Sequence, residues 1–241
     1  NSPEDPRVLR RYNQAAKITN DALAMAVKLC VPGAVVVDIC KQVDAFVAEE
    51  AKKQYTGKFL YESGIAFPCC ISLNNCAGYY SPLSDDKTAL KAGDVAKIEL
   101  ASHVSGFVAE AATTVCVGEA AEGDKKRVIV AGYTALQDVI AKLQPGVNCS
   151  DITAAVQAVC AAHDVKAVET IVSRNMERYI IDGPKYIYNS DEKADDIVVE
   201  ENDVWNLDIV LTTGPNHMVE RDARTTVFKR NVDETYILKM K

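Results

Sequence analysis

Apolar residues recur at helical spacing in several segments of this chain, and each such segment predicts an amphipathic helix. The expected helices cover residues 7–29, 38–53, 122–143 and 151–163. Pro-Gly pairs at 32–33 and 145–146 follow two of these segments, and such a pair is typical of a helix end. Asp38 is expected to cap the second helix.

Shorter apolar runs between and after the helices predict strands. They cover 64–73, 95–104, 107–117, 165–173, 204–211, 225–229 and 236–239. Ser105-Gly106 separates the second run from the third and predicts a tight hairpin turn there. The order of elements is two helices, strands, two helices and strands again, which favours an α+β fold.

Two short motifs occur twice along the chain, in the same order and at nearly the same offset. Pro32-Gly33-x4-Asp38-Ile39-x3-Val43 recurs as Pro145-Gly146-x4-Asp151-Ile152-x3-Val156, and Asp94-Val95-x-x-Ile98-Glu99-Leu100 recurs as Asp203-Val204-x-x-Leu207-Asp208-Ile209. The repeat predicts one domain over 1–241 with two halves, roughly 7–118 and 122–241. Each half would hold a helix pair on one face of an antiparallel sheet, with a pseudo-two-fold axis between them. Coincidence between two helix-end signals is the alternative.

The composition of the chain argues against a disordered protein and against a membrane-spanning one. The chain has 241 residues, of which 48% are apolar and 25% charged, and this balance excludes disorder of the whole chain. The longest apolar runs, such as 66–73, are too short to span a membrane. The polar N-terminus lacks a signal-peptide core and an initiator Met, so we expect a trimmed or partial chain.

Cysteine and charge patterns limit the chemistry. None of the 8 Cys forms a C-x-x-C pair, and we expect reduced intracellular thiols. Only 3 His are present, which restricts every mechanism that needs an imidazole. A formal net charge of −7 does not favour nucleic-acid binding, but residues 221–241 carry more basic than acidic side chains.

The repeat places Glu99 and Asp208 at equivalent positions of the two halves, each within an apolar run. A buried ionised carboxylate is costly unless it is paired, hydrogen-bonded or bound to a metal. Glu110 lies on the strand after the predicted hairpin turn, and the turn makes it a diagonal neighbour of Glu99. Three acids at the pseudo-symmetry axis would suit hard or borderline cations. The alternative is that Glu110 faces solvent and the other two acids pair with Lys or Arg.

Several segments carry a family resemblance. Gly64-Ile65-Ala66-Phe67-Pro68, Ser72-Leu73-Asn74-Asn75-Cys76, Ser81-Pro82, Lys97-Ile98-Glu99-Leu100 and His103-Val104-Ser105-Gly106-Phe107 resemble the type 2 methionine aminopeptidases, which have the pita-bread fold. Ile181-Asp182-Gly183-Pro184-Lys185, Thr225-Thr226-Val227-Phe228-Lys229-Arg230 and Leu238-Lys239-Met240-Lys241 are similar to the proliferation-associated, ErbB-receptor-binding branch of that family. The resemblance spans nearly the whole chain and implies the duplicated fold inferred above. Residues 1–241 are expected to lack the C-terminal part of the family fold.

The resemblance also implies a set of site residues. The peptidases hold two metals with two Asp, one His and two Glu, and a further His assists. The Asp positions match Glu99 and Glu110, the ligand His falls near Ser173, the first Glu matches Asp208, and the assisting His matches Tyr79. None of these positions keeps the peptidase residue, so the resemblance implies a pseudo-peptidase without catalytic residues or a metal cofactor. Binding of one Mg²⁺ or Ca²⁺ ion by Glu99, Glu110 and Asp208 is a remaining alternative.

Two catalytic alternatives remain beside the pseudo-peptidase. One is an active metallo-aminopeptidase that releases N-terminal Met. The other is a prolidase or creatinase of the same fold, which would need the same metal ligands. His103 could share a strand face with Glu99 and replace a missing imidazole, or it could be an ordinary edge or turn histidine.

The resemblance implies binding partners. Proteins of this branch associate with ribosomes near the peptide exit, with structured RNA and with protein partners, and they occur in cytoplasm, nucleus and nucleolus. We expect a monomer that binds the large ribosomal subunit and no membrane. The candidate contacts to RNA are Arg221, Arg224, Lys229 and Arg230, with 125–127 in support. Lys52-Lys53 is read as solvated charge. A module that binds only proteins is the alternative.

Overall fold

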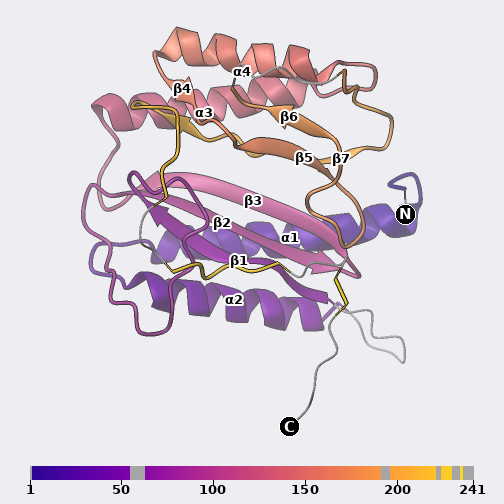
Figure 1. Ribbon diagram of the computed structural model, residues 1–241. Helices are drawn as coiled ribbons and strands as arrows, with labels where there is room; N and C mark the ends of the chain where they lie inside the picture. The colour runs from indigo at the N-terminus through magenta and orange to yellow at the C-terminus, as the bar shows by residue number, and fades with distance from the viewer. Residues whose placement is uncertain (1, 55–62, 191–195, 221–223, 230–233, 236–241) are drawn as a thin grey trace.

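The computed structural model describes residues 2–54, 63–190, 196–220, 224–229 and 234–235. The first half contains α1 (Pro6–Leu29), α2 (Val36–Lys52), β1 (Ser63–Leu73), β2 (Val95–Val104) and β3 (Phe107–Cys116). The second half contains α3 (Gly123–Lys142), α4 (Cys149–His163), β4 (Lys166–Ala167), β5 (Val172–Met176), β6 (Tyr186–Tyr188), β7 (Val204–Asn206) and β8 (Leu211–Thr212). Figure 1 shows the two helix pairs on the outside of the molecule and the strands between them.

The first half is an antiparallel sheet with the order β1-β2-β3, covered on one face by α1 and α2. Side chains alternate along β2, so Ala96, Ile98 and Leu100 face the helices and are almost fully buried. Small residues on α1, among them Ala15 and Ala22, allow the helix to approach the sheet closely. The opposite face of β2 is left for residues that do not serve this core, and Glu99 lies on it.

Matching hydrogen bonds in the two halves confirm the duplication that the repeat predicts. The N–H of Gly33 donates to the carbonyl oxygen of Leu90 at 2.7 Å, and the N–H of Gly146 donates to that of Val199 at 2.8 Å. Both glycines have positive φ, at 87° and 90°, which explains why Gly recurs at this place in the repeat. The chain therefore closes the helix end against the following segment in the same way twice.

The second motif of the repeat also has one structure in both halves. An oxygen of Asp94 accepts the N–H of Lys91 at 2.8 Å, and an oxygen of Asp203 accepts the N–H of Glu200 at 2.8 Å. Each aspartate thus closes the turn that precedes its strand, β2 or β7. The predicted α+β fold with two helix pairs over antiparallel sheets is confirmed.

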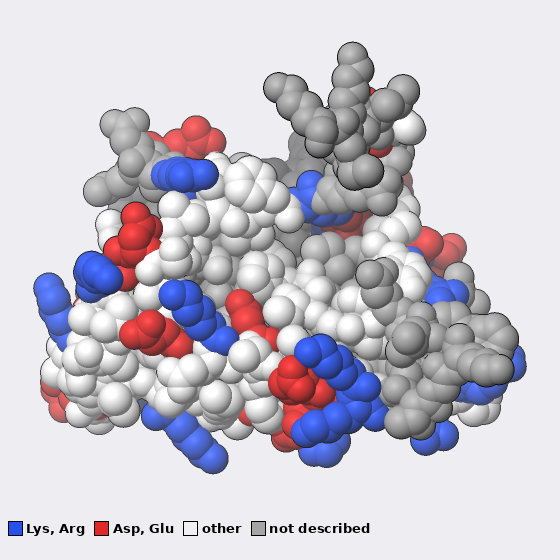
Figure 2. Space-filling model, turned by 90° about the horizontal axis from the view of Figure 1, so that it is seen from below, with Lys and Arg blue, Asp and Glu red and all other residues white. Residues whose placement is uncertain are grey.

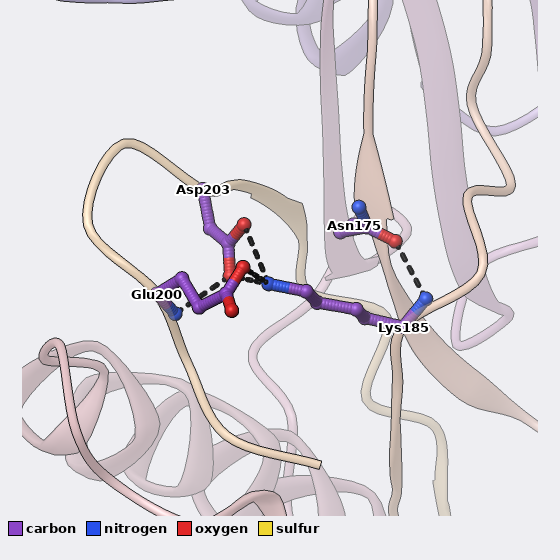
Figure 3. Close-up of polar contacts among 4 residues, drawn as sticks. All are labelled: Asn175, Lys185, Glu200 and Asp203. Carbon is purple, nitrogen blue, oxygen red and sulfur yellow. Dashed lines mark hydrogen bonds and ion pairs between the residues drawn. The ribbon is translucent and has the colours of Figure 1, made fainter.

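A partly buried ion cluster stabilises the second half (Figure 3). Lys185 Nζ contacts the carboxylate of Asp203 at 2.8 Å and that of Glu200 at 2.6 Å. The Lys185 and Asp203 side chains are 22% and 13% exposed, so solvent screens this pair little. The N–H of Lys185 also donates to Asn175 Oδ1 at 2.8 Å, which ties the segment before β6 to β5. The cluster therefore holds the turn before β7 against the rest of its sheet.

The structure corrects several expected elements. Asp38 does not cap α2, because the helix begins at Val36 and Asp38 lies in its first turn. The single strands expected over 165–173 and 204–211 are each split in two, and the sheet of the second half is accordingly two smaller sheets, β4-β8 and β6-β5-β7. A turn at Glu169-Thr170 interrupts the first run, and residues 207–210 between β7 and β8 belong to no strand.

Further differences concern short strands in the second half of the chain. β6 was not expected, since its three residues are too few for a periodic signal. Residues 225–229 form no strand, and the strand expected over 236–239 lies outside the described residues.

All eight cysteines are free thiols, as the sequence predicts. Within the described part of the chain, no helix combines the length and apolar character needed to cross a membrane.

Candidate functional site

Glu99 and Glu110 meet on the face of the first sheet that points away from α1 and α2. In the ladder between β2 and β3, Glu99 is opposite Ala112 and Ala101 is opposite Glu110. The two acids are therefore diagonal neighbours, as the hairpin turn predicts. The interaction between their carboxyl groups contributes to raising the pKa of Glu99 and opposes the rise in the pKa of Glu110. Glu110 faces this neighbour rather than open solvent.

Asp208 reaches the same place from the second half. It lies between β7 and β8, not within a strand as expected, and polar side chains fix its backbone. Its N–H donates to Ser173 Oγ at 3.0 Å, and its carbonyl oxygen accepts a hydrogen bond from Asn189 Nδ2. Ser173, at 2% exposure, is buried behind Asp208 and positions its main chain.

Tyr79 connects the two halves of the site. Its hydroxyl donates to Asp208 Oδ2 at 3.1 Å, and its backbone N–H donates to the Glu99 carboxyl group. Its φ is +60°, an unusual value for a residue with a large side chain. The ring edge packs against Phe67 of β1. All five positions that the resemblance singles out are thus brought together, with Tyr79, Glu99, Glu110 and Asp208 in one network and Ser173 behind it.

Sequence reasoning missed Asn206, which completes the network. Its Nδ2 donates to Glu110 Oε2 at 2.8 Å. The signal was its position two residues before Asp208, because residues two apart in extended chain lie on the same side. Among the residues that the structure describes, Glu99, Glu110 and Asp208 form no ion pair with Lys or Arg, so the alternative pairing finds no support there.

The surroundings raise the pKa values of the acids of the site. Burial is the main cause that raises the pKa of Glu99 to about 8, followed by the charges of Asp208 and Glu110. Burial and then Asp208 raise the pKa of Glu110 to about 7. Burial also raises the pKa of Asp208, while the hydrogen bond from Tyr79 opposes this shift. The pKa of the Tyr79 hydroxyl is raised by burial and by the same acids, so it stays a donor.

These donors do not fit the pair of transition-metal ions that the fold family implies. The set contains carboxyl and hydroxyl oxygens but no imidazole, the usual protein ligand of such metals. The Tyr79 and Ser173 hydroxyls are already engaged with Asp208. Across the described residues, no three Asp, Glu, His or Cys side chains are arranged to hold a metal ion. We therefore derive no catalytic step through a metal.

His103 does not replace the missing imidazole. Its Nδ1 accepts the N–H of Gly106 at 3.2 Å across the β2–β3 turn, and its ring contacts Tyr179. This is the turn histidine that the sequence allowed as an alternative. Its ring nitrogen serves the hairpin turn at the end of β2.

The four candidate RNA contacts differ in exposure and in ion pairing, and two of them lie outside the described residues. Arg224 is exposed, whereas Lys229 forms an ion pair with Asp182. Arg221 and Arg230 lie outside the described residues. Figure 2 views the lower face of Figure 1, where α2 lies, and its basic side chains are spread out with acidic ones among them. The described residues thus give the proposed basic surface only partial support.

Ion pairs also account for several other basic residues. Lys52 pairs with Glu49 and Lys53 with Glu50 on the surface of α2, which agrees with solvated charge. In the supporting run 125–127, Arg127 contacts Asp124 and Asp164.

Comparison with solved structures defines the class of protein. The methionine aminopeptidase of Thermotoga maritima aligns with a TM-score of 0.76 at 20% identity, over 90% of this chain and 84% of that chain. A structure described as a thermophilic Arx1 aligns with a TM-score of 0.84 at 26% identity, over 98% of this chain and 71% of that chain. The fold is therefore the pita-bread fold of the methionine aminopeptidases.

The family follows from the sequence comparison. The model of metallopeptidase family M24 matches residues 10–224, and the chain belongs to this family. Proliferation-associated protein A of Dictyostelium discoideum is 38% identical over 98% of this chain and 63% of its own length. ErbB-3 binding protein 1 of Solanum tuberosum is 40% identical over 98% of this chain and 62% of its own length. These relatives confirm the branch resemblance, and the chain spans less than two thirds of their length.

Proposed function

We propose that this chain is a catalytically inactive M24 protein that acts by binding the large ribosomal subunit, structured RNA and protein partners. The observation that carries the first part is the network of Tyr79, Glu99, Glu110 and Asp208, in which acids hydrogen-bond one another and a tyrosine. A peptidase of this fold needs those positions to hold two ions.

The chemistry of the substitutions supports this proposal. Glu in place of Asp at two positions adds a methylene to each, roughly 1.2–1.5 Å of reach, where metal ligands must be placed within about 0.2 Å. Two-metal hydrolases need ions about 3.5–4 Å apart to share an activated water. Ser173 offers no imidazole, and Tyr79 is a poor acid or base near neutral pH because its pKa is raised.

The binding role is supported by the relatives and the family resemblance. Relatives carry the names ErbB-3 binding protein 1 and curved DNA-binding protein. The family resemblance implies association with ribosomes and RNA. The exposed Arg224 is a described side chain that could contact phosphate. We further propose that 1–241 forms one domain, that the protein is a monomer, and that it occurs in the cytoplasm, nucleus and nucleolus.

Replacing Arg221, Arg224, Lys229 and Arg230 by Ala is expected to weaken binding to large ribosomal subunits. Each lost phosphate contact lowers the salt dependence of binding, so the slope of log K against log salt should fall by about 0.7–0.9 for each contact. Co-sedimentation of the full-length protein over a salt series measures both effects. Lys52→Ala with Lys53→Ala is the matched control, because those cations pair with glutamates on α2. If the unaltered protein stays in the supernatant at low salt, ribosome binding is refuted.

A further inference from the structure

An exposed tyrosine from the second half covers the tip of the β2–β3 hairpin of the first half. The N–H of Tyr179 donates to the carbonyl oxygen of Gly106 at 2.7 Å. Gly106 has a φ of +83°, and a Cβ added there would lie 2.6 Å from three ring atoms of Tyr179. One face of the Tyr179 ring therefore rests on the glycine backbone, which only a residue without a side chain permits.

Two guanidinium groups surround the aromatic rings at this tip. Arg178 lies 5.2 Å from the centroid of the Tyr179 ring and 5.3 Å from that of Phe107. Its Nε donates to the carbonyl oxygen of Ser105 at 2.8 Å, which fixes its orientation. Arg11 of α1 lies 5.6 Å from the Phe107 centroid. Cation–π contacts of this kind hold both arginines close to the rings.

Tyr179 itself remains open to a partner. It is 56% exposed although one ring face is covered, while the neighbouring Phe107 is 1% exposed. The backbone of Tyr179 has a φ of +65°, which is unfavourable for a residue with a side chain. The fold thus keeps a large aromatic ring exposed at the surface in a strained backbone conformation, and Arg178 and His103 contact the same ring.

We propose that Tyr179 is a stacking platform for an unpaired base of structured RNA, with Arg178 beside it and Arg11 beside the neighbouring Phe107. The proposal rests on the RNA-binding function proposed above and assigns that function a contact site. Single-stranded bases are commonly recognised by stacking on aromatic rings and guanidinium planes, and every base offers a face for this contact.

The local charge favours an anionic partner. The chain as a whole has a net charge of −7, whereas Arg11 and Arg178 make the hairpin tip basic. The exposed Glu177 adds one negative charge, which contributes to the raised pKa of Tyr12 on α1. The two arginines together carry more positive charge than this one acid supplies negative charge. A basic site within an acidic protein selects a polyanion more than a neutral or basic peptide. A partner protein that used Tyr179 instead of RNA would contradict the proposal.

The test compares binding of a labelled RNA hairpin whose single-stranded loop of about ten nucleotides, long enough for one binding site, carries one 2-aminopurine. Tyr179→Ala and Tyr179→Leu are each expected to weaken binding about 5-fold or more, because base stacking on an aromatic ring contributes at least that factor. Tyr179→Leu keeps a bulky apolar side chain over Gly106 and guards against loss of folding. Stacking quenches 2-aminopurine in the unaltered protein, and both variants should lose this quenching. Neither variant should change the salt slope, since no phosphate contact is removed.

Tyr133→Ala is the matched control, because Tyr133 is an exposed tyrosine of α3, 67% exposed. It should bind and quench like the unaltered protein. If both Tyr179 variants keep the unaltered affinity and quenching while binding remains salt-dependent, the stacking site is refuted and RNA binding stands. If Tyr179→Leu binds like the unaltered protein, bulk rather than an aromatic face matters, and the proposal is also refuted. If the unaltered protein binds no RNA, both the site and the proposed RNA-binding function fail.

Discussion

Replacing Glu99 and Glu110 together by Gln is expected to stabilise the protein above pH 8 and to remove most of the pH dependence of its unfolding free energy. The folded protein raises the pKa of these groups from 4.5 to about 8 and about 7. The folded state therefore holds protons that the unfolded state releases. This contribution to stability is fully present below about pH 4.5 and is lost as the pH rises through 7 and 8.

The shift of Glu99 from 4.5 to about 8 alone corresponds to about 5 kcal/mol, since one pKa unit is about 1.4 kcal/mol. Because the two groups titrate together, the expected gain at pH 9 is on the order of 5 kcal/mol. Gln keeps the shape of Glu and can still accept hydrogen bonds from Asn206 and from the Tyr79 backbone. Urea unfolding at pH 5 and pH 9 measures the effect. Glu201→Gln, at an exposed turn, is the control and should change neither value. A double variant that is less stable than the unaltered protein at pH 9 would contradict this expectation, because it would mean that the fold stabilises the ionised acids.

Replacing Lys185 by Met is expected to lower the unfolding free energy by about 2–4 kcal/mol, because it leaves a partly buried carboxylate without its cation. The Asp203 side chain is 13% exposed. Its carboxylate contacts Lys185 Nζ and accepts a hydrogen bond from the N–H of Glu200. Figure 3 shows how the Lys185 side chain reaches between Asp203 and Glu200. Urea unfolding at pH 7 measures the loss.

Lys53→Met provides the matched control for this cluster. Lys53 forms an ion pair with Glu50 on α2, but its side chain is 64% exposed, so the change should cost less than about 0.5 kcal/mol. Adding Asp203→Leu to Lys185→Met should recover part of the loss, since the unpaired charge is then removed. Equal losses in Lys185→Met and Lys53→Met would mean that the cluster is screened like any surface pair.

The sequence predicted the parts of the fold that repeat or alternate clearly. The match of Pro32-Gly33 with Pro145-Gly146 was enough to infer the duplication, because both glycines need positive φ to close the same hydrogen bond. The hairpin turn at Ser105-Gly106 fixed the register that makes Glu99 and Glu110 neighbours. Local rules determine these features, so the sequence reveals them.

Features that depend on contacts between the two halves could not be predicted in the same way. The hydrogen bond between Tyr79 and Asp208, and the placement of Asn206 beside Glu110, join residues that are far apart along the chain. The splitting of the second sheet likewise depends on packing rather than on periodicity. Tyr179 carried no signal, because its role arises only when its ring meets Gly106 of the other half.

We propose that the network of Tyr79, Glu99, Glu110 and Asp208 does not support metal-dependent hydrolysis, and one assay tests this directly. The purified full-length protein is incubated with a Met-initiated peptide and Co²⁺, Mn²⁺ or Zn²⁺ in turn, and free Met is measured beside the Glu99→Ala variant. We expect no Met release above the protein-free blank, and no difference between the two proteins. Release of Met by the unaltered protein that disappears in Glu99→Ala would show that these residues form a working peptidase site.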